Sequence, residues 1–335
     1  MSLNLFLLKE LSAKIGEDSL LIQANGGNTS LKENGVLWIK ASGKRLKNAL
    51  NENIFVGLDL ELLKSEIRDN TYNENIPIKN ICGSKSKSSI ETSLHAQLDQ
   101  SVVLHTHSID VIACSMAFES KEYFSESLQG INWNLIPYCR PGLPLAKAIK
   151  KAQDLNPSNV LILANHGLVI GEDTIEKAER LQKEVLHRLK QIKRKFLCPD
   201  LKKLEDIVQK IPNARLPKDK IIHSLALDSW SYELVRRNSY SPDHVVFCGK
   251  DPLIFDKTYQ PNRNKVYGIV RGRGVILLEK ATPTTEEMLK AQAEIFLRIP
   301  PGQKVRFLTD LECDELINWE AEKYRRKLNT LNKVK

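Results

Sequence analysis

Length, composition and charge describe a globular protein and exclude several classes. The chain has 335 residues, of which 41% are hydrophobic and 27% charged, enough to bury the core of one large domain or two ordinary ones. No apolar run approaches the ~20 residues that a membrane-spanning helix needs. The amino-terminal stretch has apolar residues at helical spacing and lacks the basic start of a secretory signal, which predicts a cytoplasmic protein that works without a membrane.

The basic residues and the cysteines carry no pattern that points to a special class. The net charge of +9 comes from 50 basic and 41 acidic residues, and part of it lies in the last sixteen residues. Because the aromatic residues of a base-stacking surface are missing there, we expect a solvated helix end and no nucleic-acid partner. The six cysteines form no CxxC pair, which indicates reduced thiols rather than a zinc ribbon or a disulfide scaffold.

Hydrophobic periodicity predicts alternating helices and strands along the first 195 residues. We expect helices at 3–15, within 59–80, and at 89–98, 109–117, 143–154 and 174–195. We expect strands at 20–23, 36–40, 102–104 and 159–164. The proline-containing stretch 130–145 is predicted to be irregular and 196–220 to be a linker. The segment 311–331 is predicted to be helical.

Three histidines stand where strands are expected to end. His105 and His107 flank Thr106 directly after the apolar run Val102–Leu104, and residues i and i+2 of a strand point to the same face. His166 interrupts two later apolar runs. Neutral imidazole suits zinc and similar divalent ions, and three such ligands leave one position open for a substrate. Each histidine alone is better explained as a core residue, but the three together with Glu91 predict a metal site.

Small-residue turns form a second group of candidates. Asn25–Ser30 and Ala41–Lys44 are rich in residues whose backbone N–H groups an anion can approach closely. The alternative is a pair of hairpin turns, which would be the better explanation of GGN alone. The basic, hydroxyl-rich loop Gly83–Ser89 leads directly into Glu91, which favours contact with an anion over a solvated linker. A helix capped by one of the last two serines of this loop would place Glu91 in its first turn, where the helix dipole favours a carboxylate. His95, one turn further on, is interpreted as a structural histidine rather than a support for a metal ligand.

Four segments resemble the class II aldolase/adducin family in that family's order. They are GGNTS at 26–30, SG at 42–43, SSIE at 88–91 with HTH at 105–107, and NHG at 165–167. The wording GGNTSLK, WIKASG and SIETSLHAQL is most similar to the aldolase half of bifunctional rhamnulose-phosphate aldolase/dehydrogenases. No GxGxxG or GxxxxGK[ST] motif is present, so no nicotinamide domain is expected.

The resemblance implies a fold, an assembly and a set of roles. It implies an α/β fold of three layers, α/β/α, with a mostly antiparallel central sheet, and a homo-oligomer, either a tetramer or a dimer. It implies that the substrate phosphate is held by Asn28, Ser42, Gly43, Ser88 and Ser89. It also implies a proton-donating tyrosine from a neighbouring subunit, for which Tyr123 and Tyr138 are candidates without a motif match.

The function that these residues predict is a metal-dependent aldolase that cleaves or forms a C–C bond in a small sugar phosphate. Cleavage beside a carbonyl leaves an enediolate, whose charge a divalent metal, with zinc preferred, stabilises as a Lewis acid. Glu91 is the expected carrier of the proton. The alternatives are an epimerase or dehydratase of the same fold, or a non-catalytic adducin-like scaffold. Retention of Glu91 and the three histidines favours an enzyme.

A short segment of the second half of the chain is similar in sequence to a segment of the first half. We expect a catalytic domain at 1–195, the linker at 196–220 and a further α/β region at 221–335. The stretch Gly272–Leu277 and the Thr285-Glu-Glu-Met-Leu-Lys-Ala that follows resemble Asn165–Ile170 and the Thr174-Ile-Glu-Lys-Ala that follows. Arg273 stands where His166 stands in the first copy. We therefore hypothesise a diverged repeat that has lost its metal.

Overall fold

The structure is a computed structural model that describes the chain except residues 1, 77, 79, 84–85, 256–263 and 332–335. It divides into two compact units. Unit 1 comprises Met1–Ser115 and Glu119–Lys190, and unit 2 comprises Met116–Phe118 and Gln191–Lys335. Within the described residues, no helix combines the length and the apolar character that crossing a membrane requires.

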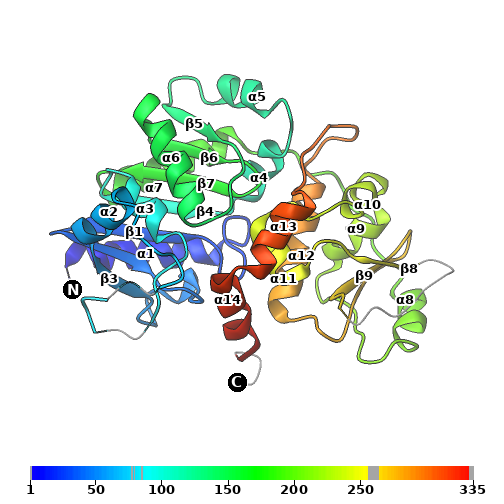
Figure 1. The fold of residues 1–335 in the computed structure, drawn as a ribbon. Helices are drawn as coiled ribbons and strands as arrows, with labels where there is room; N and C mark the ends of the chain where they lie inside the picture. The colour runs from blue at the N-terminus through cyan, green and yellow to red at the C-terminus, as the bar shows by residue number, and fades with distance from the viewer. Residues whose placement is uncertain (1, 77, 79, 84–85, 256–263, 332–335) are drawn as a thin grey trace. The chain divides into compact units, whose positions relative to one another are not determined.

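Unit 1 is built on one seven-stranded sheet, in the order β3-β2-β1-β4-β7-β6-β5 (Figure 1). The strands are Asn28–Glu33 (β1), Val36–Lys40 (β2), Phe55–Asp59 (β3), Val102–Thr106 (β4), Trp133–Ile136 (β5), Val160–Leu163 (β6) and Gly167–Glu172 (β7). Neighbouring strands pair antiparallel except β5 and β6, which run parallel. The predicted α/β fold with a mostly antiparallel sheet is confirmed, and the sheet is mixed rather than purely antiparallel.

Helices cover both faces of this sheet. On one face pack helices α1 (Leu3–Glu17), α4 (Ile109–Ser115), α5 (Ser120–Ser127) and α7 (Ile175–Arg188). On the other face pack α2 (Leu60–Arg68), α3 (Thr92–Gln97) and α6 (Leu143–Leu155). Strand β4 shows why its sequence is continuously apolar: Val102 and Leu104 face the first layer while Val103 faces the second.

Several local predictions for unit 1 differ from the structure. The predicted turn Asn25–Ser30 gives way to strand β1 at Asn28, no strand was predicted for β3, and the helix predicted at 174–195 ends at Arg188. Residues 20–23 form a turn rather than a strand, although the carbonyl of Leu21 accepts a hydrogen bond from the N–H of His107 at 2.9 Å. The stretch 130–145, predicted to be irregular, contains β5, whose parallel pairing with a distant strand leaves no local signal. Helix α3 begins at Thr92, later than predicted, with Glu91 at its N-cap position.

Unit 2 contains a smaller sheet and several helices. Strands β8 (Leu253–Phe255), β9 (Tyr267–Val270) and β10 (Gly274–Leu277) are ordered β10-β9-β8. Its helices are α8 (Leu201–Val208), η2 (Lys220–His223), α9 (Ser224–Leu227), α10 (Ser229–Val235), α11 (Pro242–Cys248), α12 (Pro283–Phe296), α13 (Asp310–Asn318) and α14 (Glu320–Leu331). The predicted linker therefore contains α8, which is not a bare connector because Leu204 packs in a core with Val270 and Ile276.

The strand pattern of unit 2 parallels part of unit 1. Strand β8 pairs parallel with β9, and β9 pairs antiparallel with β10, as β5, β6 and β7 do in unit 1. A helix follows the last strand in both cases, α12 in unit 2 and α7 in unit 1. Arg273 lies in the turn between β9 and β10, as His166 lies in the turn between β6 and β7. This agreement is what a diverged repeat would produce, and the repeat stays a prediction.

Candidate active site

The three predicted histidines meet in unit 1. His105 lies on β4 and His107 directly after it, while His166 lies in the turn between β6 and β7. The ring centroids are 4.9 to 5.1 Å apart, and one ligand atom from each ring lies within 4.8 Å of the other two. All three side chains are buried. The pairing of β4 with β7 brings His166 close to His105 and His107, although His107 and His166 are 59 residues apart in the sequence.

Backbone geometry sets the position of His166. Asn165 has a φ of +59°, a left-handed conformation that lets the chain turn sharply out of β6. Gly167 follows, and a Cβ built on it would lie 2.2 Å from the carbonyl oxygen of Thr106 and 3.2 Å from Cα of His107. Only glycine allows the turn to lie this close to the end of β4.

This geometry predicts a matched pair of variants on one strand. Gly167→Ala is expected to destabilise the protein by ~1–3 kcal/mol, because the new methyl group pushes on backbone, and to lower its metal content. Gly171→Ala is the control, because the atoms nearest to its Cβ belong to the side chain of Gln100, at 3.0 Å, and a side chain can move. Thermal unfolding and metal analysis of both variants would measure the difference. Equal behaviour of the two would contradict a tight fit at Gly167.

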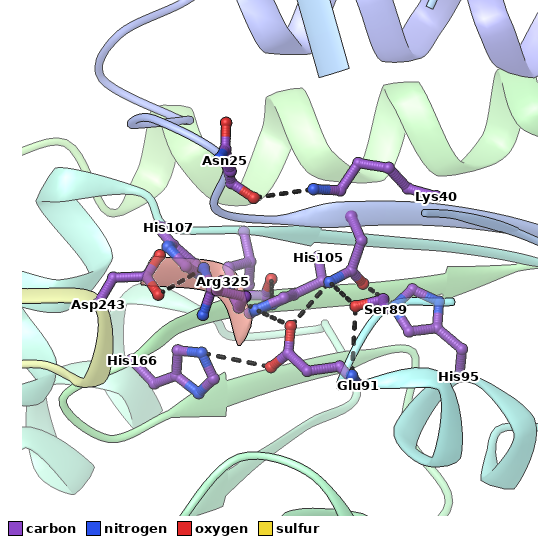
Figure 2. A network of polar contacts seen from close by, with 12 residues as sticks. Asn25, Lys40, Ser89, Glu91, His95, His105, His107, His166, Asp243 and Arg325 are labelled. Carbon is purple, nitrogen blue, oxygen red and sulfur yellow. Dashed lines mark hydrogen bonds and ion pairs between the residues drawn. The ribbon is translucent and has the colours of Figure 1, made fainter. Parts of the chain in front are cut away.

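Glu91 lies against the imidazoles. Its Oε2 is 3.4 Å from Nε2 of His105, and its Oε1 is 3.3 Å from Nε2 of His166 (Figure 2). The amide Nδ2 of Asn28 donates a hydrogen bond to Oε2 at 2.7 Å. The carboxylate makes no capping hydrogen bond to α3. Glu91 is therefore held by groups of the site rather than by the helix that it precedes.

The surroundings of Glu91 favour its charged form. Burial alone would raise the pKa of the carboxyl, but the imidazoles of His105, His166 and His107 and the hydrogen bond from Asn28 outweigh it and lower the pKa to about 2. The carboxyl group of Glu91 is thus ionised at neutral pH.

The donor set fits a divalent metal. The Nδ1 of His105 is 3.1 Å from the carbonyl oxygen of Leu168, which accepts only if this nitrogen carries the proton. The lone pair of Nε2 then lies on the side of the ring where Nε2 of His107 is 3.2 Å away. A backbone carbonyl that fixes the tautomer of a ligating imidazole is a common feature of metal sites. Three converging, buried imidazoles with a carboxylate beside them match the ligand chemistry of zinc and similar ions.

The small-residue turns lie beside Glu91. The N–H of Ser42 donates to the carbonyl of Lys87 at 2.9 Å, and the N–H of Ser89 donates to the carbonyl of Lys40 at 3.1 Å. The turn at Ser42 and Gly43 therefore runs along the segment Ser88–Ser89, and Ala41 forms an isolated bridge with Ser88. Residues 84 and 85 of the predicted anion-contacting loop lie outside the described residues. The structure thus brings all five residues that the resemblance assigns to phosphate into one neighbourhood.

A buried lysine that the sequence did not indicate joins the two turns. Nζ of Lys40 donates to the carbonyl of Asn25 at 2.8 Å (Figure 2). It also donates to the carbonyl of Lys44 at 2.9 Å. Its side chain is only 3% exposed. The ammonium group thus bridges the two turns. A lone lysine at the end of a predicted strand gave no signal of this role.

The two candidate tyrosines lie in different places. Tyr123 packs against the core beneath α1, α4, α5 and α7, on the opposite face of the sheet from α3. Tyr138 follows the carboxyl end of β5, the end at which the parallel strand β6 reaches the Asn165 turn. Tyr138 and His166 therefore follow the carboxyl ends of two neighbouring parallel strands, β5 and β6.

Comparison with known proteins gives a consistent result for unit 1. Residues 9–192 match the family model described as the Class II Aldolase and Adducin N-terminal domain. A protein of Bacillus subtilis (strain 168) described as "Uncharacterized oxidoreductase YuxG" is 34% identical over 177 residues, which cover 48% of this chain and 25% of that protein. This chain thus corresponds to about a quarter of the length of that relative.

Solved structures align with the same part of the chain. The N-terminal class II aldolase domain of a conserved protein from Thermoplasma acidophilum aligns with a TM-score of 0.50 and 23% identity, covering 56% of this chain and 93% of that one. An L-fuculose-1-phosphate aldolase from Thermus thermophilus aligns with a TM-score of 0.40 and 17% identity, covering 56% and 93%. The first likeness supports the fold, and the second is too weak to add to it.

Proposed function

The chain belongs to the class II aldolase and adducin family, and from this premise we propose that it is a metal-dependent aldolase acting on a small sugar phosphate. The observation that carries the proposal is the buried group of His105, His107 and His166 with the Glu91 carboxylate in contact with two of the rings. A non-catalytic member of the family would have no need of an ionised carboxylate beside three converging imidazoles. We also propose that the protein works in the cytoplasm as a homo-oligomer, a tetramer or a dimer, as the resemblance implies.

The histidines would hold the cation and leave it open to the substrate. When bound, a divalent ion supplies Lewis-acid stabilisation of the negative charge that develops on substrate oxygens as a C–C bond beside a carbonyl breaks. Because the three ligands are neutral imidazoles, they leave the full positive charge of the ion available for this purpose. We propose zinc, because the ligands are all nitrogen and the group is compact.

Glu91 is proposed to move the proton. Its carboxylate is ionised and held on one side by the Asn28 amide, which leaves Oε1 directed at His166 and the region beside it. A carboxylate fixed in this way can accept the proton of a substrate hydroxyl as the C–C bond breaks and then deliver a proton to the carbon that the broken bond leaves behind. In the reverse reaction it would take the proton from that carbon and return it to the oxygen.

Ser42, Gly43, Ser88 and Ser89 are proposed to bind the substrate phosphate. The support is that they gather in one neighbourhood next to Glu91, where the serines carry hydroxyl groups that can donate to an anion. Gly43 has a φ of +76°, which turns the backbone in a way that other residues rarely adopt. An anion held there would place the rest of a short substrate near the histidines.

A screen for retro-aldol cleavage tests the proposal directly. Ketose 1-phosphates with different configurations would be incubated with the zinc-loaded protein, and released dihydroxyacetone phosphate would be measured with a coupled dehydrogenase. We expect cleavage of at least one of these substrates and its loss after chelation. Inversion at a carbon without cleavage would instead identify an epimerase, and metal binding without turnover of any substrate would favour the non-catalytic members of the family.

A further inference from the structure

A groove on unit 1 gathers basic side chains on the face of the sheet that α2, α3 and α6 cover. Helix α3 packs against both α2 and α6, and residues of these two helices and of the end of α3 line the groove. Its volume is about 640 Å³, a size typical of small-molecule sites. Its charged lining residues are Lys64 and Arg68 of α2, Lys147, Lys150, Lys151 and Asp154 of α6, and Asp99 after α3. Basic residues thus outnumber acidic ones five to two.

Helical spacing places these cations on the outer face of each helix. In α6 the three lysines occupy positions i, i+3 and i+4, while Leu145 and Ile149 face the core. In α2, Lys64 and Arg68 are four residues apart, while Leu63 faces the core. Side chains three or four residues apart lie ~5–6 Å from one another on a helix surface. Two rows of cations therefore line the groove, one from each helix.

Neither helix dipoles nor ion pairs account for this excess of positive charge. Arg68 lies in the last turn of α2, where a cation stabilises the helix dipole, but α6 has no basic residue in its last turn. Lys150 pairs with Asp154, and Nζ of Lys64 lies 3.8 Å from Oδ1 of Asp99, whose side chain is 98% exposed. Exposed pairs of this kind are weak, so their cations can turn to a ligand.

A buried amine close to the groove is affected by the same charges. Nζ of Lys32 donates to the carbonyl of Gln100 at 2.7 Å. Burial, and after it the charge of Lys64, lower the pKa of Lys32 to about 7, against the opposing effect of Asp99. His95 of α3 also interacts with Lys32, and burial keeps this imidazole neutral. An anion in the groove would oppose the charge of Lys64 and so raise the pKa of Lys32.

The lining of the groove favours a small ligand with several negative charges. Among the described residues no aromatic side chain lines it, so it lacks the stacking surface with which proteins bind single-stranded nucleic acid. A single phosphate group reaches one or two of the cations, whereas a chain of two or three phosphate groups has enough oxygens to contact both rows. Leu155, which is 80% exposed, adds an apolar contact at the end of α6.

We propose that this groove binds a small polyanion that carries a di- or triphosphate group, held between Lys64 and Arg68 of α2 and Lys147 and Lys151 of α6. The ligand is either a nucleotide or an inorganic polyphosphate, because both carry the same recognised group. None of the residues proposed for the metal, the proton transfer or the substrate phosphate lines the groove. The inference is therefore independent of the proposed function.

Calorimetric titration of the full chain with inorganic tripolyphosphate and with ATP tests the site. Excess inorganic phosphate is present throughout, to occupy the turns beside Glu91. Lys147→Gln/Lys151→Gln is expected to lower the affinity for both ligands by ~10-fold or more, because it removes two charge-assisted hydrogen bonds. Lys177→Gln/Lys183→Gln is the matched control, with the same change of charge at two exposed positions of α7 on the opposite face of the sheet. It should leave both affinities within ~2-fold of those of the unchanged protein.

The relative affinities identify the source of the phosphate chain. Equal binding of the two ligands would support recognition of the triphosphate alone, and tighter binding of ATP would support a nucleotide whose organic part contacts Leu155. If neither ligand bound, or if the two double variants lost the same affinity, the proposal would be overturned. It would also be overturned by a single-stranded RNA oligonucleotide that bound more tightly than ATP through the same lysines, because the groove would then belong to a nucleic-acid surface.

Proton uptake on binding gives a second readout, which locates the anion near Lys32. Titrations at pH 7 in two buffers with different heats of ionisation measure the number of protons bound with the ligand. Because Lys32 is half protonated near its pKa, the unchanged protein should take up as much as ~0.5 proton per ligand more than Lys32→Met, whose side chain does not titrate. Equal proton uptake by the two proteins would place the anion elsewhere and contradict the proposal.

Discussion

Turnover is expected to fall ~10²–10⁴-fold when Glu91 is replaced by glutamine, while the metal stays bound. Glutamine keeps the shape of the side chain, and its oxygen can still accept from Asn28, but it cannot take up a proton. The carboxylate oxygens lie 3.3 and 3.4 Å from the nitrogens of His166 and His105, and no capping role in α3 explains the residue. The loss therefore falls on the chemical step.

The measurement combines kcat on the identified ketose phosphate with metal analysis of the same preparation. Glu179→Gln is the control, since Glu179 makes the same kind of charged contact, with Lys14 at 2.6 Å, on the surface helix α7. If Glu91→Gln retained full activity, Glu91 would be structural and the mechanism would be wrong. In that case only a helix-dipole effect of ~0.3–1 kcal/mol on stability would remain.

The family, the fold of unit 1 and the grouping of the three histidines could be predicted from sequence because their signals are local. A three-residue HTH motif after an apolar run places two imidazoles on one side of a strand end, and the NHG turn contains both the third imidazole and the glycine that its position requires. The apolar runs also gave β2, β4 and β6, but not β1, whose first residues were predicted to be a turn. Strand β5 was missed because it is four residues long and pairs with a strand far along the chain.

The contacts that support the site could not be predicted, because they join residues that are far apart in the sequence. Asn28 and His95 are 67 residues apart, and their contact depends on how α3 packs against β1. Lys40 joins two turns through backbone carbonyls, which any sequence provides. His95 was interpreted as a structural histidine. Its spacing of four residues from Glu91 was the only local sign that the two side chains share one surface of a helix.

Removal of the metal should have the other large effect. Lewis-acid stabilisation contributes several kcal/mol to such a transition state, and each 1.36 kcal/mol is a factor of ten in rate, so chelation should lower turnover by ~10²–10⁴-fold. Zinc should restore it. His166→Ala is expected to cause the same loss of turnover. The ligand atoms of the three histidines lie within 4.8 Å of one another, and the two that remain would bind the ion much more weakly than three. This variant would also remove the contact between Oε1 of Glu91 and Nε2 of His166.

Metal analysis after dialysis distinguishes this expectation from its alternatives. We expect close to one zinc per chain in the unchanged protein and in His187→Ala, an exposed histidine on α7, and much less in His166→Ala. Circular dichroism would show whether His166→Ala remains folded, which is expected because the turn at Asn165 and Gly167 does not depend on the imidazole. If the folded variant kept its metal, His166 would not be a ligand. If the unchanged protein bound no divalent ion, the three converging imidazoles would serve only the packing between β4 and β7, and an enzyme of this class would be excluded.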